Sequence, residues 1–389
     1  MNPADLNLRH LKAMVATVTS GSVSAAAAQV NLTQPAITQG IAKLERQIGL
    51  PLFERQPGGM KATEAAEILV PRARGALELV GSPRMTAPQM RAFLALARAG
   101  SYAGAAEATG IREASLHRAV ADLGLGLGQK LVERRGRGVA LTARGATLAR
   151  RLRLAESELR AGLAELETLK GREVGRISVG AMPLSRARLL PNAIAAFHRA
   201  HPQADVMVVE GSFAELVGPL RDGEIDLMLG ALRESPVGDD LVQRHLFRDR
   251  PVILGRAHHP LASPTALPTP ADLAGFDWVL PAEGTPLRQQ WRQMFVDSGV
   301  EPPRVAIECG SVIVVRQLLV HGDFLTLLSP DQVAVELEAG WLAQIGTVPG
   351  DPSRIIGVTT RAAWRPTALQ QRFLDRILTE AGQIGKIED

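Results

Sequence analysis

The 389-residue sequence is poor in several residue types, and each shortage excludes a class of protein. Cys309 is the only cysteine, so the chain can form neither an intrachain disulfide nor a thiolate zinc cluster, which suits a reducing compartment. Aromatic residues make up only 4%, with a single tyrosine, which leaves few side chains to stack on RNA bases. With 46% hydrophobic and 22% charged residues, the composition excludes a disordered or fibrous chain.

Long apolar stretches are also missing from the sequence. The first ten residues, Met1 to His10, lack the apolar core of a secretory signal peptide. The most apolar region, Val312 to Leu328, contains Arg316, His321 and Asp323 and is too polar to span a bilayer. We therefore expect a cytoplasmic protein with no membrane partner.

Charge is distributed unevenly along the chain. Residues 1–174 carry 24 Lys and Arg against 15 Asp and Glu, a net charge of +9. Residues 175–389 carry 20 against 25, a net charge of −5. A basic module that binds a polyanion, joined to a mildly acidic domain, explains this asymmetry, although a solvated face would explain it equally well.

An internal repeat organises the first 150 residues. The offset of 79 that relates Gly21-Ser22 to Gly100-Ser101 recurs without a gap over roughly 40 residues. It also relates Ala26-Ala27 to Ala105-Ala106, Leu44 to Leu123, Gly49 to Gly128, Leu52 to Leu131, Glu54-Arg55 to Glu133-Arg134 and Thr63 to Thr142. The repeat predicts two tandem copies of one small fold, which we name copy one and copy two.

Copy one is predicted to contain three helices and a hairpin. The first helix ends at Gly21, as a C-cap glycine would end it, and Ser22 or Ser24 can cap a second helix. Thr33 can cap a third helix, and a hairpin with basic residues follows at Phe53 to Thr63. A tight turn before a helix that begins with amide and hydroxyl side chains is typical of a helix-turn-helix, whose second helix enters the major groove of DNA.

Double-stranded DNA is therefore the expected partner of copy one. Its expected contacts are Thr33, Gln34, Pro35, Thr38, Gln39 and Lys43 on the third helix and Arg55 and Lys61 on the hairpin.

The run from Gly21 to Arg55, GSVSAAAAQVNLTQPAITQGIAKLERQIGLPLFER, resembles the winged helix-turn-helix of LysR-type transcriptional regulators. The most specific parts of this resemblance are Thr33-Gln34-Pro35-Ala36, Leu44-Glu45 and Leu52-Phe53-Glu54-Arg55. The resemblance implies a sequence-specific DNA-binding regulator that acts as a homodimer or as a tetramer built from dimers. Such regulators usually carry a single module, so a tandem second winged helix-turn-helix leaves the half-site geometry open.

Copy two keeps the frame of copy one but loses much of its reading surface. Arg112-Glu113-Ala114-Ser115 stands where copy one has Thr33 to Ala36, and Gly124, Gly126 and Gly128 predict that the third helix ends early. Copy two could contact the DNA backbone, bind a second sequence or act as a spacer, and we favour backbone contact. The expected contacts are Arg112, Arg118, Arg134, Arg135 and Arg137.

A long helix is predicted from Ala143 to Lys170. Its apolar residues follow a spacing of three and four: Leu148, Leu152, Ala155, Leu159, Gly162, Leu166 and Leu169. Such a stripe packs either on its own domain or, as the resemblance implies, on a second chain as an antiparallel dimer helix. The stretch Thr63 to Val80 contains Pro71 and is predicted to be only a connector between the copies.

From Gly175 onward, predicted strands alternate with predicted helices. The segments GRISVG, AFHRAHP and LRDGEIDLMLGAL resemble the effector-binding domain of the same family, which implies the two-lobed α/β fold of periplasmic binding proteins. The expected protein is thus multidomain, with two winged helix-turn-helix modules rich in α-helix, a linker helix and a two-lobed effector domain. The expected boundaries are 1–82, 83–142, 143–172 and 173–389, with the second lobe at about 251–350.

In such a fold a ligand lies between the lobes, at strand ends and helix N-termini. The expected effector contacts are Leu184, Ser185, Arg186, Ser212, Ala231, Leu232, Pro281, Gly284, Thr285, Ser311 and Val312. Each hydroxyl in this set could equally be a helix cap with no ligand. GAMPLSRARLLP and WVLPAEGTPLRQQW resemble the branch that includes the regulator of a galactose-binding protein, which suggests a sugar. Arg186 or Arg188 facing the cleft would instead favour a small organic acid.

Other classes of protein find less support in the sequence. His258-His259 is the only His pair, and adjacent residues do not share a helix face, so we expect no metal site. The sequence has no GxSxG nucleophile motif and Cys309 has no motif partner, so we expect neither an enzyme nor a cofactor. The alternative that stays open is a cytoplasmic small-molecule-binding protein whose basic modules bind nucleic acid non-specifically.

Overall fold

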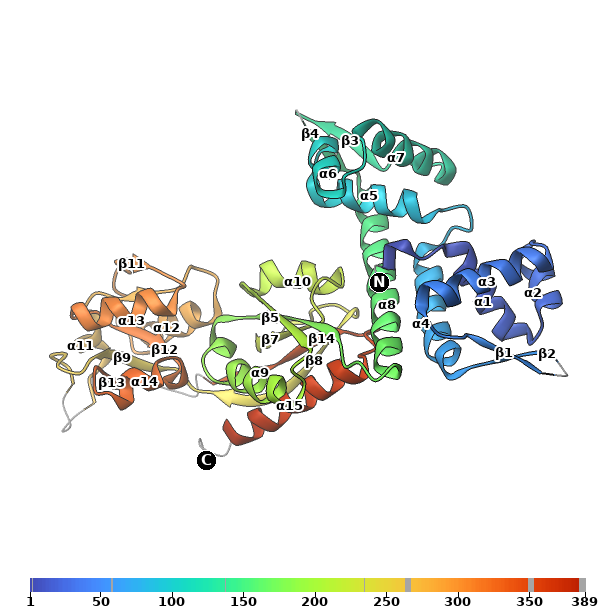
Figure 1. Cartoon of the computed structure of the whole chain (residues 1–389). Coiled ribbons are helices and arrows are strands. Elements are labelled where there is room, and N and C mark those ends of the chain that lie inside the picture. The colour runs from blue at the N-terminus through green and yellow to red at the C-terminus, as the bar shows by residue number, and fades with distance from the viewer. Residues whose placement is uncertain are drawn as a thin grey trace.

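A computed structural model describes residues 1, 3–56, 59–136, 138–233, 235–262, 267–348 and 353–384. A helical head, the long helix α8 and two α/β lobes follow one another across the molecule (Figure 1). Arg137, an expected DNA contact, lies outside the described residues, as does the side chain of Arg186. In the described part of the chain, no helix is both long enough and apolar enough to cross a membrane.

Copy one forms three helices and a hairpin, as the sequence predicts. Its elements, after η1 (Pro3–Asp5), are α1 (Leu8–Ser20), α2 (Val23–Val30), α3 (Gln34–Ile48), β1 (Phe53–Gln56) and β2 (Gly59–Ala62). Gly21 ends α1 in the left-handed region with φ 72°. Ser22 and Thr33 cap α2 and α3, because their hydroxyl oxygens accept bonds from backbone N–H groups of the first turn. The predicted caps of copy one are thus confirmed, with Ser22 instead of Ser24 at the second.

Copy two has the same order of elements. They are α5 (Ala87–Ala99), α6 (Tyr102–Thr109), α7 (Glu113–Leu127), β3 (Val132–Arg135) and β4 (Gly138–Leu141). The predicted early end of the third helix is wrong, because α7 runs through Gly124 and Gly126 and stops at Gly128. Gly128 is equivalent to Gly49, which ends α3 in the same left-handed conformation. Burial of three apolar residues of α7, namely Leu116, Val120 and Leu123, outweighs the low helix propensity of glycine.

Helices α4 (Glu64–Val80) and α8 (Ala143–Leu169) pack against each other in antiparallel orientation. A Cβ on Gly162 of α8 would lie 3.0 Å from Cδ1 of Leu69 of α4, whereas Arg151 of α8 donates to the carbonyl of Glu78 of α4 at 3.4 Å. The expectation that the stretch containing Pro71 is only a connector is therefore wrong. Pro71 lies on the exposed side of a continuous helix, where its missing N–H can be tolerated.

The apolar stripe of α8 is buried within the chain, because the head forms one hydrophobic core that includes both copies, α4 and α8. Leu148, Leu152, Ala155, Leu159 and Leu166 are all buried in it, and Leu169 is exposed. A second chain cannot use this stripe without displacing α4, so the structure does not support the expected dimer helix.

The first lobe is built on a five-stranded sheet in the order β6-β5-β7-β14-β8. Its elements are β5 (Gly175–Ala181), η2 (Pro183–Arg186), α9 (Leu189–Ala200), β6 (Ala204–Glu210), α10 (Phe213–Arg221), β7 (Leu227–Ala231), β8 (Leu241–Asp249), β14 (Arg354–Arg361) and α15 (Ala368–Ile384). Strands β6, β5 and β7 are parallel, and β14 is antiparallel to both β7 and β8. Helices α9 and α15 cover one face of the sheet and α10 covers the other (Figure 1).

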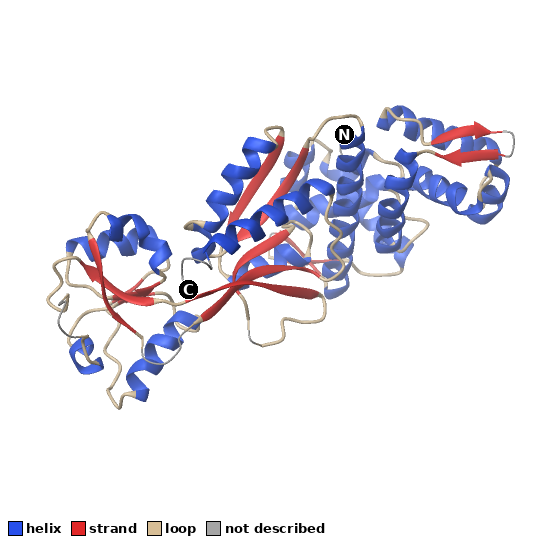
Figure 2. Ribbon diagram, turned by 90° about the horizontal axis from the view of Figure 1, so that it is seen from below, coloured by secondary structure: helices blue, strands red, loops and turns tan. Residues whose placement is uncertain are grey.

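The second lobe is smaller and lies beyond the first, on the far side from the head (Figure 2). Its elements are β9 (Val252–Arg256), α11 (Pro270–Ala274), β10 (Val279–Leu280), α12 (Pro286–Asp297), β11 (Ile307–Glu308), α13 (Val312–His321), β12 (Thr326–Leu328), η3 (Pro330–Val333), α14 (Ala334–Glu338) and β13 (Leu342–Thr347). Trp278, Trp291 and Phe295 fill its core with edge-to-face contacts. The chain passes between the lobes twice, before β9 and after β13.

Candidate nucleic-acid interface and ligand cleft

The expected DNA contacts of copy one lie on one exposed surface around the N-terminal half of α3. All six residues of the predicted set on this helix are exposed: Thr33, Gln34, Pro35, Thr38, Gln39 and Lys43. Ser24 accepts a hydrogen bond from Nε2 of Gln34 at 3.0 Å, so the preceding helix orients this amide. The surface therefore presents an amide of fixed orientation at the start of an exposed helix.

The hairpin of copy one adds two exposed cations beside α3. Arg55 lies opposite Met60, and Lys61 lies opposite Glu54 in the antiparallel register. Because successive side chains of a strand point to opposite faces, this register places Arg55 and Lys61 on opposite faces of the hairpin.

The close approach of α3 to α1 depends on Gly40. A Cβ at Gly40 would lie 3.0 Å from Cδ2 of His10, whose ring is packed beneath the helix. Burial lowers the pKa of His10, and the neighbouring Lys43 lowers it further, so this imidazole is neutral at pH 7. The cations of this surface are therefore on the exposed face of α3 and on the hairpin, and not beneath the helix.

Copy two presents a different surface. Arg112, Arg118, Arg134 and Arg135 are exposed, as expected for backbone contacts. Glu113, however, occupies the position of Gln34, and the N-terminus of α7 has no side-chain cap. A carboxylate at this end repels phosphate unless it accepts a bond from a cytosine amino group.

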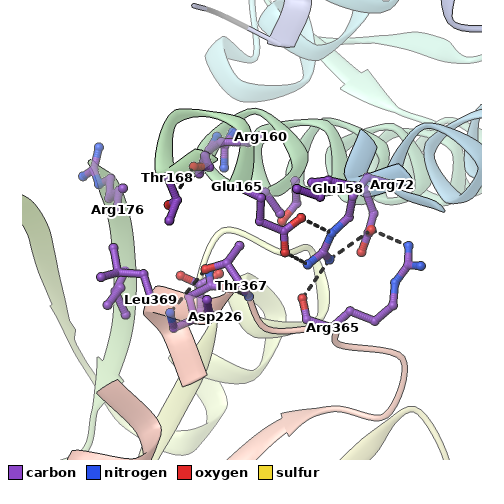
Figure 3. A pocket seen from close by; sticks show the side chains of 18 of the residues that line it. Arg72, Glu158, Arg160, Glu165, Thr168, Arg176, Asp226, Arg365, Thr367 and Leu369 are labelled. Atoms are coloured by element: carbon purple, nitrogen blue, oxygen red, sulfur yellow. Dashed lines mark hydrogen bonds and ion pairs between the residues drawn. The ribbon is translucent and has the colours of Figure 1, made fainter. Parts of the chain in front are cut away.

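A cavity of about 730 Å³ lies where α4 and α8 meet the first lobe (Figure 3). Arg72, with only 7% of its side chain exposed, forms one wall and makes a two-pronged ion pair with Glu165 through bonds of 2.7 and 3.2 Å. It also donates to the carbonyl of Arg365 in the first lobe at 2.8 Å. Burial disfavours the charge on Arg72, but the carboxylates of Glu165 and Glu158 outweigh this penalty and raise its pKa.

Sequence reasoning missed Arg72, although a signal was present. Arg72 falls between Leu69 and Ala73 in the buried stripe of α4, where a charged residue needs an internal partner. On the opposite wall, Asp226 accepts a hydrogen bond from the N–H of Ser178 at 2.8 Å, and burial raises its pKa. Buried polar groups around this cavity therefore connect the head to the first lobe.

A second cavity, of about 610 Å³, lies between the two lobes. Six of the expected effector contacts line it: Leu184, Ser212, Ala231, Pro281, Thr285 and Val312. Four others do not line it, namely Ser185, Leu232, Gly284 and Ser311. Ser185 is 1% exposed and donates to the carbonyl of Met182, so it is buried within the first lobe. Leu232 is half-buried and packs over Gly357 of β14.

The two expected hydroxyl groups that line this cleft also serve as helix caps. Ser212 donates to Glu215 at 2.8 Å and caps α10, and Thr285 donates to the carbonyl of Ala282 at 2.9 Å and caps α12. Their hydroxyl protons are used within the protein, so charged side chains carry more of the cleft's binding potential than the sequence suggested.

Two arginines that sequence reasoning missed line the same cleft. Arg233 follows the end of β7, and its guanidinium lies 4.6 Å from the ring centre of Phe213. Arg354 begins β14 and donates from Nε to Asp249 at 2.6 Å. The rule that selected Ala231 could have found Arg233, two residues further along the chain. The structure does not support the alternative in which Arg188 faces the cleft, because Arg188 bonds to Glu338 of the second lobe at 3.1 Å and so bridges the two lobes.

A helical head with an exposed reading helix, joined to a two-lobed unit with a cleft, defines a DNA-binding regulator with its own ligand sensor. Comparisons with known proteins agree. The LysR substrate binding domain family matches residues 170–382, and the lysR family of bacterial regulatory helix-turn-helix proteins matches residues 8–67 and 88–146. The chain belongs to the LysR family of transcriptional regulators, which bind DNA and respond to small-molecule effectors.

Individual relatives agree with this assignment. The chain is 34% identical over 372 residues to the HTH-type transcriptional regulator GalR of Pseudomonas putida, with 92% of each protein covered. It is 33% identical over 266 residues to the SDS degradation transcriptional activation protein of a Pseudomonas species, covering 67% of this chain and 85% of that protein.

Solved structures share the fold. A full-length OxyR variant from Pseudomonas aeruginosa has a TM-score of 0.56 at 23% identity, covering 75% of this chain and 97% of that one. CbnR, a LysR family transcriptional regulator, has a TM-score of 0.53 at 22% identity, covering 75% of this chain and 98% of that one.

Proposed function

We propose that copy one and copy two are both winged helix-turn-helix modules and that copy one reads the operator sequence. The observation that carries this proposal is the exposed surface of α3, where Gln34 is held by Ser24 at the start of the helix. Its DNA contacts are those named above on α3, together with Arg55 and Lys61 of the hairpin.

Copy two holds the DNA backbone in this proposal. Its exposed arginines at positions 118, 134 and 135 provide cations for phosphate, while Glu113 makes its α7 a weak reader of bases. Arg118 stands where copy one has Gln39, so a positive charge replaces a neutral amide on the same helix face.

The cleft between the lobes is the effector site, and its ligand is a small organic acid. Arg233 and Arg354 line the cleft together with Glu210, Glu215 and Glu308. The preference for a carboxylate rests mainly on Arg233, because Arg354 is already paired with Asp249, and guanidinium groups recognise carboxylates with paired hydrogen bonds. A neutral sugar would instead be bound by the polar groups of Ser212, Thr285 and Gln332. A thermal-shift comparison of small carboxylic acids with hexoses separates the two ligand classes, and stabilisation by hexoses alone would contradict the organic acid.

The effector signal reaches the head through the first lobe. Arg150 of α8 is ion-paired with Asp240 at 2.7 Å, Arg153 of α8 bonds to Asp222, and Arg72 bonds to the backbone of the first lobe. The first lobe is therefore fixed to the head, and ligand-induced movement of the second lobe alters the strain on these contacts. If the protein forms a homodimer or tetramer, the additional contacts come from surfaces other than the buried stripe of α8.

The direct test of sequence reading replaces Gln34 with Ala. The intact protein first selects a duplex from a randomised library. We expect Gln34→Ala to weaken binding to this selected duplex by about 1–3 kcal/mol, while binding to a random duplex stays the same. Gln47→Ala on the same helix is the matched control, because Gln47 is an exposed amide outside the predicted contact set. Equal losses on selected and random DNA would contradict a base-reading role for Gln34.

A further inference from the structure

The two halves of the head are related by packing as well as by sequence. When the 79-residue offset is applied, six buried residues of α4 fall on buried residues of α8. The pairs are Ala66 and Gly145, Leu69 and Leu148, Val70 and Ala149, Ala73 and Leu152, Ala76 and Ala155, and Val80 and Leu159. Each linker helix therefore uses the same face, and the two faces cover each other.

The contacts between these helices are reciprocal, as an approximate two-fold axis requires. Glu78 of α4 faces Arg151 of α8. By the 79-residue offset, Arg151 is equivalent to Arg72 of α4 and Glu78 is equivalent to Ser157 of α8. The symmetry therefore predicts that Arg72 faces Ser157. Arg72 in fact bonds to Glu158, one residue away from that position.

The ends of both helices also approach the other copy, although the offset does not relate these two contacts, because α8 has 27 residues and α4 has 17. Lys170, directly after α8, donates to the carbonyl of Ile48, the last residue of α3, at 2.5 Å. Ser82, two residues after α4, lines a small cavity together with Leu127, the last residue of α7 and the equivalent of Ile48. In each half, the end of one linker helix lies against the third helix of the other copy.

The helix pair sets how far apart the starts of the two linker helices lie. Each hairpin leads directly into its linker helix, so a copy lies at the N-terminal end of α4 and of α8 (Figure 1). With Leu69 opposite Gly162, Glu64 lies opposite residue 167, about 24 residues or roughly 36 Å along α8 from Ala143. One helical turn of DNA, the separation of half-sites in helix-turn-helix dimers, is about 34–36 Å.

We propose that a single chain carries a complete two-headed DNA-binding unit that spans two half-sites one helical turn apart. Because the heads differ, the half-sites differ: copy one reads the sequence of one, and copy two holds the other mainly through its phosphates. The two solved structures are matched over almost their whole length, but they cover only 75% of this chain. The remaining quarter of the chain is consistent with one added copy. The inference rests on the proposed function for its DNA contacts, but the internal pairing of α4 with α8 can be tested without DNA.

The DNA-free test uses a cross-link between exposed positions on the two helices. The variant Cys309→Ser, Glu78→Cys and Arg151→Cys is treated with a short bis-maleimide, since both positions are exposed and face each other. A cross-link within one chain is expected. A covalent two-chain species as the main product would overturn the inference, because it would mean that α4 packs on the α8 of another chain. The single-cysteine variant without Arg151→Cys is the control for random coupling.

The DNA-bound test combines a footprint with the mass of the complex. We expect one 41.5 kDa chain on the library-selected duplex to protect two segments about one turn apart. Gln34→Ala should reduce protection of one segment, Arg134→Ala with Arg135→Ala should reduce protection of the other, and Arg199→Ala, an exposed residue of α9, should change neither. Two chains required for two segments, with each variant weakening both equally, would overturn the inference. Absence of any selected sequence would instead contradict the proposed function, while the cross-link would still decide the pairing.

Discussion

Replacing Arg72 with Met should cost the protein about 3 kcal/mol of its free energy of unfolding. The guanidinium is nearly fully buried, bonds twice to Glu165, once to Glu158, and to backbone carbonyls of Arg365 and Pro366. Removing one partner of a buried ion pair leaves the other charge uncompensated and typically costs 3–5 kcal/mol. We expect the lower end of about 3 kcal/mol, because the two carboxylates are 18% and 23% exposed and Arg365 stays bonded to Glu158.

Urea denaturation followed by circular dichroism measures this loss. Arg74→Met is the matched control, since Arg74 is an exposed arginine on the same helix that donates to the hydroxyl of Thr19, and its replacement should cost less than about 1 kcal/mol. Combining Arg72→Met with Glu165→Gln should recover part of the loss, with a coupling of about 1–3 kcal/mol. If Arg72→Met is as stable as the control, or if the two changes add without coupling, the account of this junction is wrong.

Three further predictions follow from single sites. Gly126→Ala should raise stability by about 0.5–1 kcal/mol in the same urea assay, because a Cβ there meets nothing within 4 Å and α7 is helical at that point; destabilisation would contradict the helix. Arg233→Gln should weaken binding of whichever small carboxylic acid stabilises the protein by about tenfold or more in calorimetry, whereas Arg244→Gln, outside the cleft, should have no effect. Burial raises the pKa of Asp226, so the folded state keeps this proton to a higher pH than the unfolded state does. Asp226 therefore destabilises the fold as the pH rises from 3.8, the ordinary pKa of an aspartic acid, through the raised pKa. Asp226→Asn should therefore gain stability relative to the native chain as pH rises through that window, and a constant difference across the window would contradict the buried acid.

The sequence predicted local structure well because local signals decide it. The caps at Ser22 and Thr33 and the helix end at Gly21 depend on residues within one turn of each other, and all three were confirmed. The glycines of α7 misled the prediction, since a weak local preference gave way to burial of Leu116 and its neighbours against the rest of the head.

Features that depend on distant segments were harder to predict. The stripe on α8 showed that something must cover that helix, but only the folded chain identifies the cover as α4, roughly 80 residues earlier. The cleft shows the same limit. Arg354 reaches the cleft from β14, which follows the whole second lobe in the sequence and pairs antiparallel with β7. No motif near Arg354 predicts that position.

Phosphate contact by copy two is tested most directly by a salt titration of DNA binding by the intact protein and by the Arg134→Ala, Arg135→Ala variant. We expect both proteins to prefer the library-selected duplex to random DNA. The variant should have a slope of log affinity against log salt that is shallower by about 1.8, because it loses two phosphate contacts. An unchanged slope with preference intact would make copy two a spacer, and no preference for any sequence would contradict the assignment of sequence reading to copy one.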